Sequence, residues 1–171
     1  MPLQGISDQL REIAAHSGAE FKTDVVGFRV TIPTSGDVTQ PSAEQLRGEY
    51  DYFVVEIRAA MTGSGGTNNA STEDGYVDDV QEIRFNLRES GTGQNVFSTD
   101  VELATLVDSR SGQPAHPLNF KGFGYKIRAG AHLQPTFTRR SSSISLARIV
   151  NLQLVCVLVP KNYQLVPSRQ Y

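Results

Sequence analysis

The sequence has one cysteine, no tryptophan and three histidines in 171 residues. A single cysteine, Cys156, excludes an intrachain disulfide, so the fold has to be stabilised by its core. The neighbours of Cys156 are apolar, which predicts a small core residue, since a reactive thiol needs an exposed, electropositive setting. No apolar run approaches the ~20 residues of a membrane span, and the first residues lack the basic and apolar regions of a signal peptide. We therefore expect neither feature.

A strong charge of either sign is also missing. The chain carries 16 Lys and Arg against 18 Asp and Glu, a formal net charge of −2, so it offers no strong field to nucleic acid or to an anionic membrane. Arg139-Arg140 beside Ser141–Ser143 is a small basic patch without the interleaved aromatic residues that stack on bases. Residues 1–20 hold one arginine, Arg11, whereas a genome-packaging arm is basic. We expect no nucleic-acid partner and no membrane partner.

The motifs of common catalytic sites are missing too. There is no Gly-x-Ser-x-Gly elbow to expose a nucleophilic serine. The glycine-rich stretch from Gly63 to Gly66 lacks the Gly-Lys-Ser/Thr ending of a phosphate-binding loop. The sequence therefore predicts a protein that is not an enzyme and that has no cofactor.

Two metal sites remain as less favoured alternatives. His116 and His132 are able to form a site if the fold brings them together, with Asp100 or Glu102 as a third ligand. The acidic stretch Glu73-Asp74-Gly-Tyr-Val-Asp78-Asp79 offers oxygens to Ca²⁺ but does not match the EF-hand spacing. Scattered surface histidines and a solvated acidic loop are the interpretations that we favour.

What the sequence does contain, after residue 21, is a series of strands. Val26–Ile32 alternates apolar and polar residues, and Ile83, Phe85 and Leu87 alternate with polar neighbours at the end of the run 80–88. The last run, Leu146–Val159, is apolar on both faces, which predicts a central strand. The other expected strands are Tyr50–Met61, Asn95–Ser98, Val101–Val107, Leu118–Phe120, Phe123–Ile127 and Leu133–Thr138. Strands separated by Gly, Pro and Ser turns predict an all-β sandwich or barrel, and the lack of strand–helix alternation argues against a nucleotide-binding α/β fold.

The two ends of the chain differ from this series. Residues 1–20 predict a short helical arm with an apolar stripe, which Ser7 and Gly18 can cap. Residues 21–160 form the sandwich domain, in which 62–79 is a long polar loop, and 161–171 form an extended tail. Because a short apolar helix and an apolar tail each need a surface, we expect them to bind a partner through Ile6, Leu10, Ile13, Tyr163, Leu165, Val166 and Tyr171.

Three stretches resemble the small jelly-roll proteins of tailed-bacteriophage virions, such as capsid decoration (cement) proteins. They are the hairpin-like Ile83–Val101, the stretch Phe123–Leu133 with its glycine turn, and the apolar run Val150–Pro160. The resemblance lies in the general pattern of strands and turns over residues 50–160 and includes no diagnostic motif. It implies a jelly-roll-like antiparallel β-sandwich that binds a capsid lattice, often as an oligomer.

The favoured reading is therefore a non-enzymatic virion protein, of the capsid-decoration or minor structural type. Its expected partners are the major capsid protein or another virion protein, and further copies of itself, after folding in the host cytoplasm. A first alternative is a carbohydrate- or receptor-binding module that uses Tyr50, Tyr52, Tyr76 and Tyr125 as an aromatic platform. A second is a cupin-like metalloenzyme that uses His116 and His132.

Overall fold

The computed structural model describes residues 22–63, 76–90, 92–108, 111–120, 124–141 and 144–161. The predicted helical arm 1–20 and all of the predicted tail after Lys161 lie outside these residues, and with them the seven predicted partner-binding residues. In the described part of the chain, no helix is long and apolar enough to cross a membrane.

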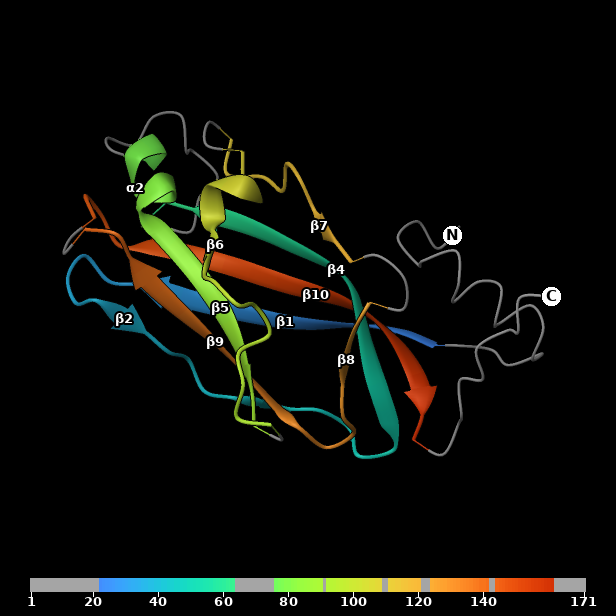
Figure 1. Cartoon of the computed structure of the whole chain (residues 1–171). Helices are drawn as coiled ribbons and strands as arrows, with labels where there is room; N and C mark the ends of the chain where they lie inside the picture. The colour runs from blue at the N-terminus through green and yellow to red at the C-terminus, as the bar shows by residue number, and fades with distance from the viewer. Residues whose placement is uncertain are drawn as a thin grey trace.

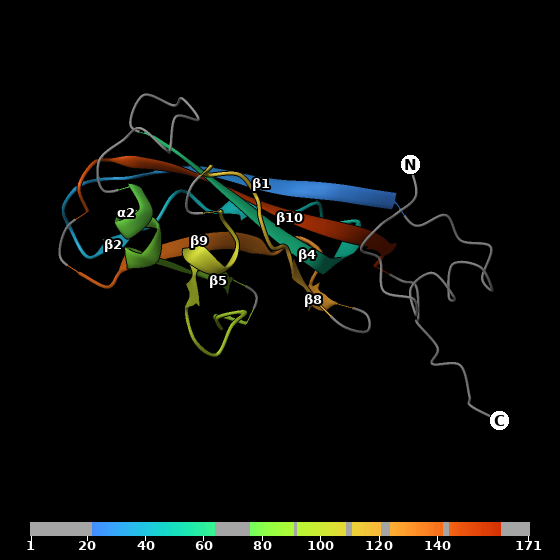
Figure 2. The ribbon, with the colours of Figure 1, turned by 90° about the horizontal axis from the view of Figure 1, so that it is seen from above.

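The chain forms two antiparallel sheets that pack face to face as a β-sandwich (Figures 1 and 2). One sheet, here the β10 sheet, has the order β1-β10-β4-β7, with β8 also paired to β4. The other, the β9 sheet, has the order β2-β9-β5-β6, with β3 also paired to β9. The bounds are β1 Lys22–Ile32, β2 Val38–Thr39, β3 Glu44–Gln45, β4 Tyr50–Thr62, β5 Ile83–Glu89, β6 Val101–Glu102, β7 Leu118–Asn119, β8 Tyr125–Ile127, β9 His132–Arg139 and β10 Arg148–Pro160.

Strand β10 is the central strand of its sheet, as its two apolar faces predict. It pairs with β1 from Lys22↔Leu158 to Ile32↔Arg148 on one side, and with β4 on the other. A β-bulge shifts the β4 register between Val155 and Cys156. Figure 1 shows β10 lying between β1 and β4 over nearly their full length.

The core lies between the two sheets. The inward side chains of β10 are fully buried at every second position, among them Val150, Leu152 and Leu154, because successive residues of a strand face opposite sides of the sheet. Phe85 of β5 continues this core from the opposite sheet, and its ring lies 6.0 Å, centroid to centroid, from that of Phe97 in an edge-on arrangement. Cys156 is also fully buried in this core, which confirms its predicted place.

Several predicted strands are shorter than expected, or helical. Residues 80–82 belong to helix α2 (Tyr76–Glu82), not to a strand; Asp78 and Asp79 lie in its first turn, where the helix dipole favours acidic residues. Residues 95–98 contribute one isolated bridge, from Asn95 to Arg88.

The predicted strand 101–107 becomes the two-residue strand β6, followed by the 3₁₀ helix η2 (Leu103–Thr105). Leu103, Leu106 and Val107 are all buried, and this spacing of three and four suits a helical turn better than a strand.

Candidate functional site

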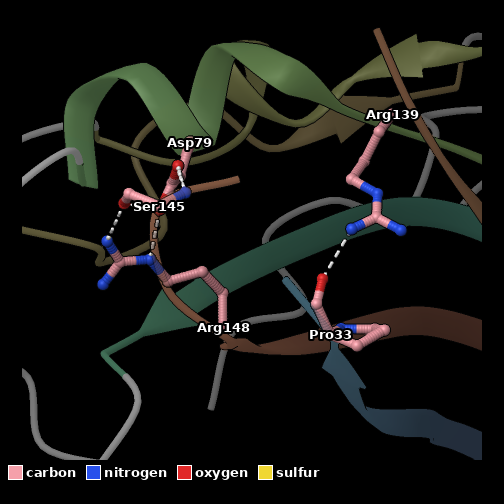
Figure 3. Close-up of polar contacts among 5 residues, drawn as sticks. All are labelled: Pro33, Asp79, Arg139, Ser145 and Arg148. Atoms are coloured by element: carbon pink, nitrogen blue, oxygen red, sulfur yellow. Dashed lines mark hydrogen bonds and ion pairs between the residues drawn. The ribbon is translucent and has the colours of Figure 1, made fainter. Parts of the chain in front are cut away.

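A polar network centred on two buried charged side chains lies where α2 meets the start of β10 (Figure 3). Arg148 is completely buried and Asp79 is 3% exposed. Arg148 Nε donates to Asp79 Oδ2 over 2.7 Å. The Ser145 hydroxyl donates to the same oxygen over 2.7 Å, and the Ser145 amide donates to Asp79 Oδ1 over 2.8 Å. Both carboxylate oxygens therefore have donors.

This network joins three parts of the chain that are distant in sequence. Asp79 lies in α2, Ser145 in the connection between β9 and β10, and Arg148 on the first residue of β10. A charged arginine without a partner is very costly to bury, so Arg148 requires the carboxylate at this position. The pair holds α2 against the end of the sandwich, and its role is therefore structural. It is called the buried clamp below.

The network corrects one prediction about the acidic stretch. Asp79 does not lie in a solvated loop, because it is buried and engaged by Arg148 and Ser145. Asp78 is exposed on α2, whereas Glu73 and Asp74 lie outside the described residues. Asp79 is thus occupied by protein donors and is not free to act as a Ca²⁺ ligand.

The alternative histidine site does not assemble among the described residues either. Among the described residues, no three His, Cys, Asp or Glu side chains gather as metal ligands. His132 begins β9 in one sheet, whereas His116 is exposed in the segment that leads to β7 in the other. Asp100 instead accepts from Asn86 and Thr138, and Glu102 pairs with Arg84.

The tyrosines do not form an exposed platform in the described part of the chain. Tyr52 is 2% exposed, and its hydroxyl accepts a hydrogen bond from the Arg47 amide over 3.3 Å. Tyr50 and Tyr125 are partly buried and pack against the core. Burial, with a contribution from the nearby Glu89, raises the pKa of Tyr125. The side chain of Tyr76 lies outside the described residues.

The basic pair Arg139-Arg140 is divided between the two sides of the β9 sheet, as alternation at the end of a strand requires. Arg139 Nη1 donates to the carbonyl of Pro33 over 2.6 Å (Figure 3). Arg140 is exposed, with Nη2 3.9 Å from Glu102 Oε1. The two guanidinium groups therefore do not form the joint phosphate-binding patch that the sequence offered.

The surface feature with the clearest capacity for interaction is the outer edge of β1. In the described structure β1 ends its sheet and pairs only with β10 along its 11 residues. Its exposed residues include Val25, which is 54% exposed. The Val25 amide donates to the Asp24 carboxylate over 2.9 Å, which indicates that the amides of odd-numbered β1 residues face away from β10. Such an edge can accept a further strand.

Comparison with protein families, with curated proteins and with solved structures found no match for this chain.

Sequence reasoning missed the buried pair Arg148 and Asp79. A signal was present for one half of it: Arg148 has the same strand parity as Val150 and Leu152, which alternation directs into the core. An arginine at an inward position requires a buried acidic partner. The sequence does not show which acid that is, because Asp79 is 69 residues away.

Proposed function

We propose that this chain is a non-enzymatic structural protein of a virion, a capsid-decoration or minor virion protein that binds and stabilises a larger assembly. One observation carries the proposal, the nested pairing of the strands. The first strand, β1, pairs with the last, β10; β2 and β3 pair with β9; β4 pairs with β7 and β8; and β5 pairs with β6. This order is the one produced when a long antiparallel hairpin is wound into two sheets, and it supports a jelly roll.

Jelly rolls are found in viral capsid proteins, in lectins and in cupins. The cupin reading needs a histidine and carboxylate cluster, and the described residues bring no such cluster together. The lectin reading needs exposed aromatic faces, and Tyr52 is buried. The structural role needs a sandwich and an edge to which neighbours can bind, and the two sheets and the free edge of β1 support it.

The β1 edge is the contact surface that we propose. Strand addition uses main-chain hydrogen bonds and so tolerates a partner of many sequences, including a capsid protein or a second copy of this chain. Lys22, Asp24 and Arg29 add charge to the edge, which limits indiscriminate pairing. The predicted arm residues Ile6, Leu10 and Ile13 stay a prediction alongside it.

The first experiment asks whether the chain is part of a particle. Virus particles from cells that produce the protein are purified on a density gradient and analysed by mass spectrometry. We expect the chain in the particle fraction at a constant copy number relative to the major capsid protein. Recovery of the chain only among free proteins would contradict the proposal.

The second experiment tests the β1 edge with two variants of one residue. Gly27→Pro removes an outward N–H, a change that edge strands tolerate, whereas Gly27→Ala keeps it and meets no atom within 4 Å. We expect Gly27→Pro to lower the association constant, for particles or for self-association, by at least about tenfold, and Gly27→Ala to leave it unchanged. Equal association of both variants would show that the edge is not the contact.

A further inference from the structure

The free edge of β1 is long, and a glycine lies at its midpoint. In the described part of the chain, β1 pairs with β10 on one side and with no strand on the other, and Figure 2 shows it as the outermost strand of its sheet. Gly27 has five residues of β1 on either side. It is exposed, and a Cβ added to it would meet no atom within 4 Å.

A midpoint at Gly27 makes the edge able to pair with a second copy along its whole length. When two identical strands run antiparallel about a two-fold axis at Gly27, Lys22 of each copy lies opposite Ile32 of the other. An axis at any other residue leaves part of the 11-residue strand unpaired. The odd-numbered residues direct their N–H and carbonyl groups away from β10, so Gly27 is itself a hydrogen-bonded position in this register.

The side chains on the outer face of the sheet suit the same register. Thr23 of one copy lies opposite Thr31 of the other, a cross-strand pair that stabilises antiparallel sheets. Val25 lies opposite Arg29, whose aliphatic stem can pack on it while the charge stays in water. An axis at Arg29 is disfavoured, because it places two arginines directly opposite each other.

The core side of β1 is least covered on either side of the midpoint. Val26 and Phe28 are each 7% exposed, compared with 4% for Val30 and 1% for Ile32. In the register about Gly27, Val26 of one copy lies opposite Phe28 of the other. Pairing therefore adds cover where the inward residues of this strand are most exposed.

We propose that two copies of this chain pair through β1, antiparallel about a two-fold axis at Gly27, so that their β10 sheets form one continuous sheet. The inference rests on the β1 edge being the contact surface of the proposed function, and it names the partner at that edge. The bond from the Val25 amide to the Asp24 carboxylate is replaced by a bond to the Arg29 carbonyl of the second copy. A two-fold contact of this kind is the commonest form of closed assembly.

The test reads the register from engineered cysteines in a Cys156→Ala chain. The two Gly27 Cα atoms of the pair lie about 5.5 Å apart, which is within the reach of a disulfide. We expect Gly27→Cys, treated with oxidised glutathione, to form a disulfide-linked dimer on non-reducing electrophoresis. Arg29→Cys, exposed on the same face, is the matched control, because its two copies lie about 14 Å apart along the strands.

Mixed chains identify the pairing partner of Arg29. An equimolar mixture of Val25→Cys and Arg29→Cys should give the mixed dimer at least about tenfold faster than either variant alone links to itself, since only the mixed pair lies within disulfide reach. Cross-linking of Arg29→Cys alone at the rate of Gly27→Cys overturns the proposal. So does a Gly27→Cys chain that stays monomeric after oxidation.

Sedimentation of the native chain separates this inference from the virion role. We expect the mass to rise from one copy to two as the protein concentration increases. A native chain that stays monomeric, but binds particles and loses that binding on Gly27→Pro, overturns self-pairing and leaves the proposed function in place. A chain that dimerises in the predicted register and is absent from particles supports self-pairing and contradicts the virion role.

Discussion

Arg148 and Asp79 form a buried ion pair. Arg148 Nε and Asp79 Oδ2 are 2.7 Å apart, and the two side chains are 0% and 4% exposed. The pair connects the first residue of the central strand to the only α-helix of the described residues. The pair matters to stability less through the attraction between its charges than through the free-energy cost of leaving one charge buried without the other.

We expect Asp79→Ala to lower the free energy of unfolding by about 3–5 kcal/mol, because the buried guanidinium group of Arg148 loses the carboxylate that lies 2.7 Å from it. The double variant Asp79→Leu with Arg148→Met is expected to recover much of this loss, since both charges of the pair are then removed together. Urea denaturation followed by circular dichroism measures both.

The control for this prediction is a surface ion pair. Arg84 and Glu102 have side chains that are 33% and 45% exposed, so Glu102→Ala should cost no more than about 1 kcal/mol. A cost for Asp79→Ala as small as that of Glu102→Ala would show that the buried clamp does not stabilise the domain.

Gly124 occupies a position in the fold that does not accept a side chain. Its φ is +79°, and an added Cβ would lie 2.3 Å from the Val54 carbonyl oxygen. Gly124→Ala is therefore expected to destabilise the domain by at least about 1–3 kcal/mol and to loosen β8 from β4. Gly27→Ala, with open space around it, is expected to be neutral or slightly stabilising. Thermal unfolding of the two variants, compared side by side, measures the difference.

The long strands were predictable because each follows a local alternation. Val26, Phe28, Val30 and Ile32 are all buried, as the period of two requires. The strands β2 and β3 have two residues each, too few to show any period. They exist because β9 offers them an edge, and this is a tertiary cause that no local pattern contains.

The polar positions were harder to place for the same reason. Alternation directs Asn86 outward from β5, yet it is 5% exposed, because the segment after Asn95 crosses over it. Of the candidate site residues, Cys156 was placed correctly by its apolar neighbours. Asp79 was not, because its partner Arg148 comes from the far end of the sequence. Whether a polar side chain of this kind is buried depends on segments that are distant in sequence, and a single sequence does not show which segments those are.

Asn86 fastens the segment 95–100 to β5. Its Nδ2 donates to the Phe97 carbonyl over 3.2 Å and to Asp100 Oδ1 over 3.0 Å, and its Oδ1 accepts from the Phe97 amide over 3.3 Å. We expect Asn86→Ala to cost about 1–3 kcal/mol, because the partly buried main-chain groups of Phe97 lose their partner. Hydrogen exchange should show faster exchange at the Phe97 amide.

The comparison for Asn86 is an exposed side-chain hydrogen bond on the neighbouring strand. Gln40 Nε2 donates to Thr136 Oγ1 over 3.1 Å at an exposed site, so Gln40→Ala is expected to change stability by no more than about 0.5 kcal/mol. If Asn86→Ala is equally mild and the Phe97 amide stays protected, the segment is held by its other contacts, such as the hydrogen bond from the Val96 amide to the Leu87 carbonyl.

Cys156 makes the stability of the domain depend on pH in the alkaline range. Burial, with a smaller contribution from Asp24, raises the pKa of its thiol from 9.0 to about 12. The folded state keeps the proton that the unfolded chain loses near pH 9, so this contribution is complete below that pH and is lost as the pH rises toward 12. We expect the free energy of unfolding to fall more steeply between pH 9 and 12 in the native chain than in Cys156→Ala, in which other alkaline titrations are retained. Parallel slopes would mean that the thiol ionises equally well in both states, and rapid labelling of Cys156 in the folded protein would agree with that result.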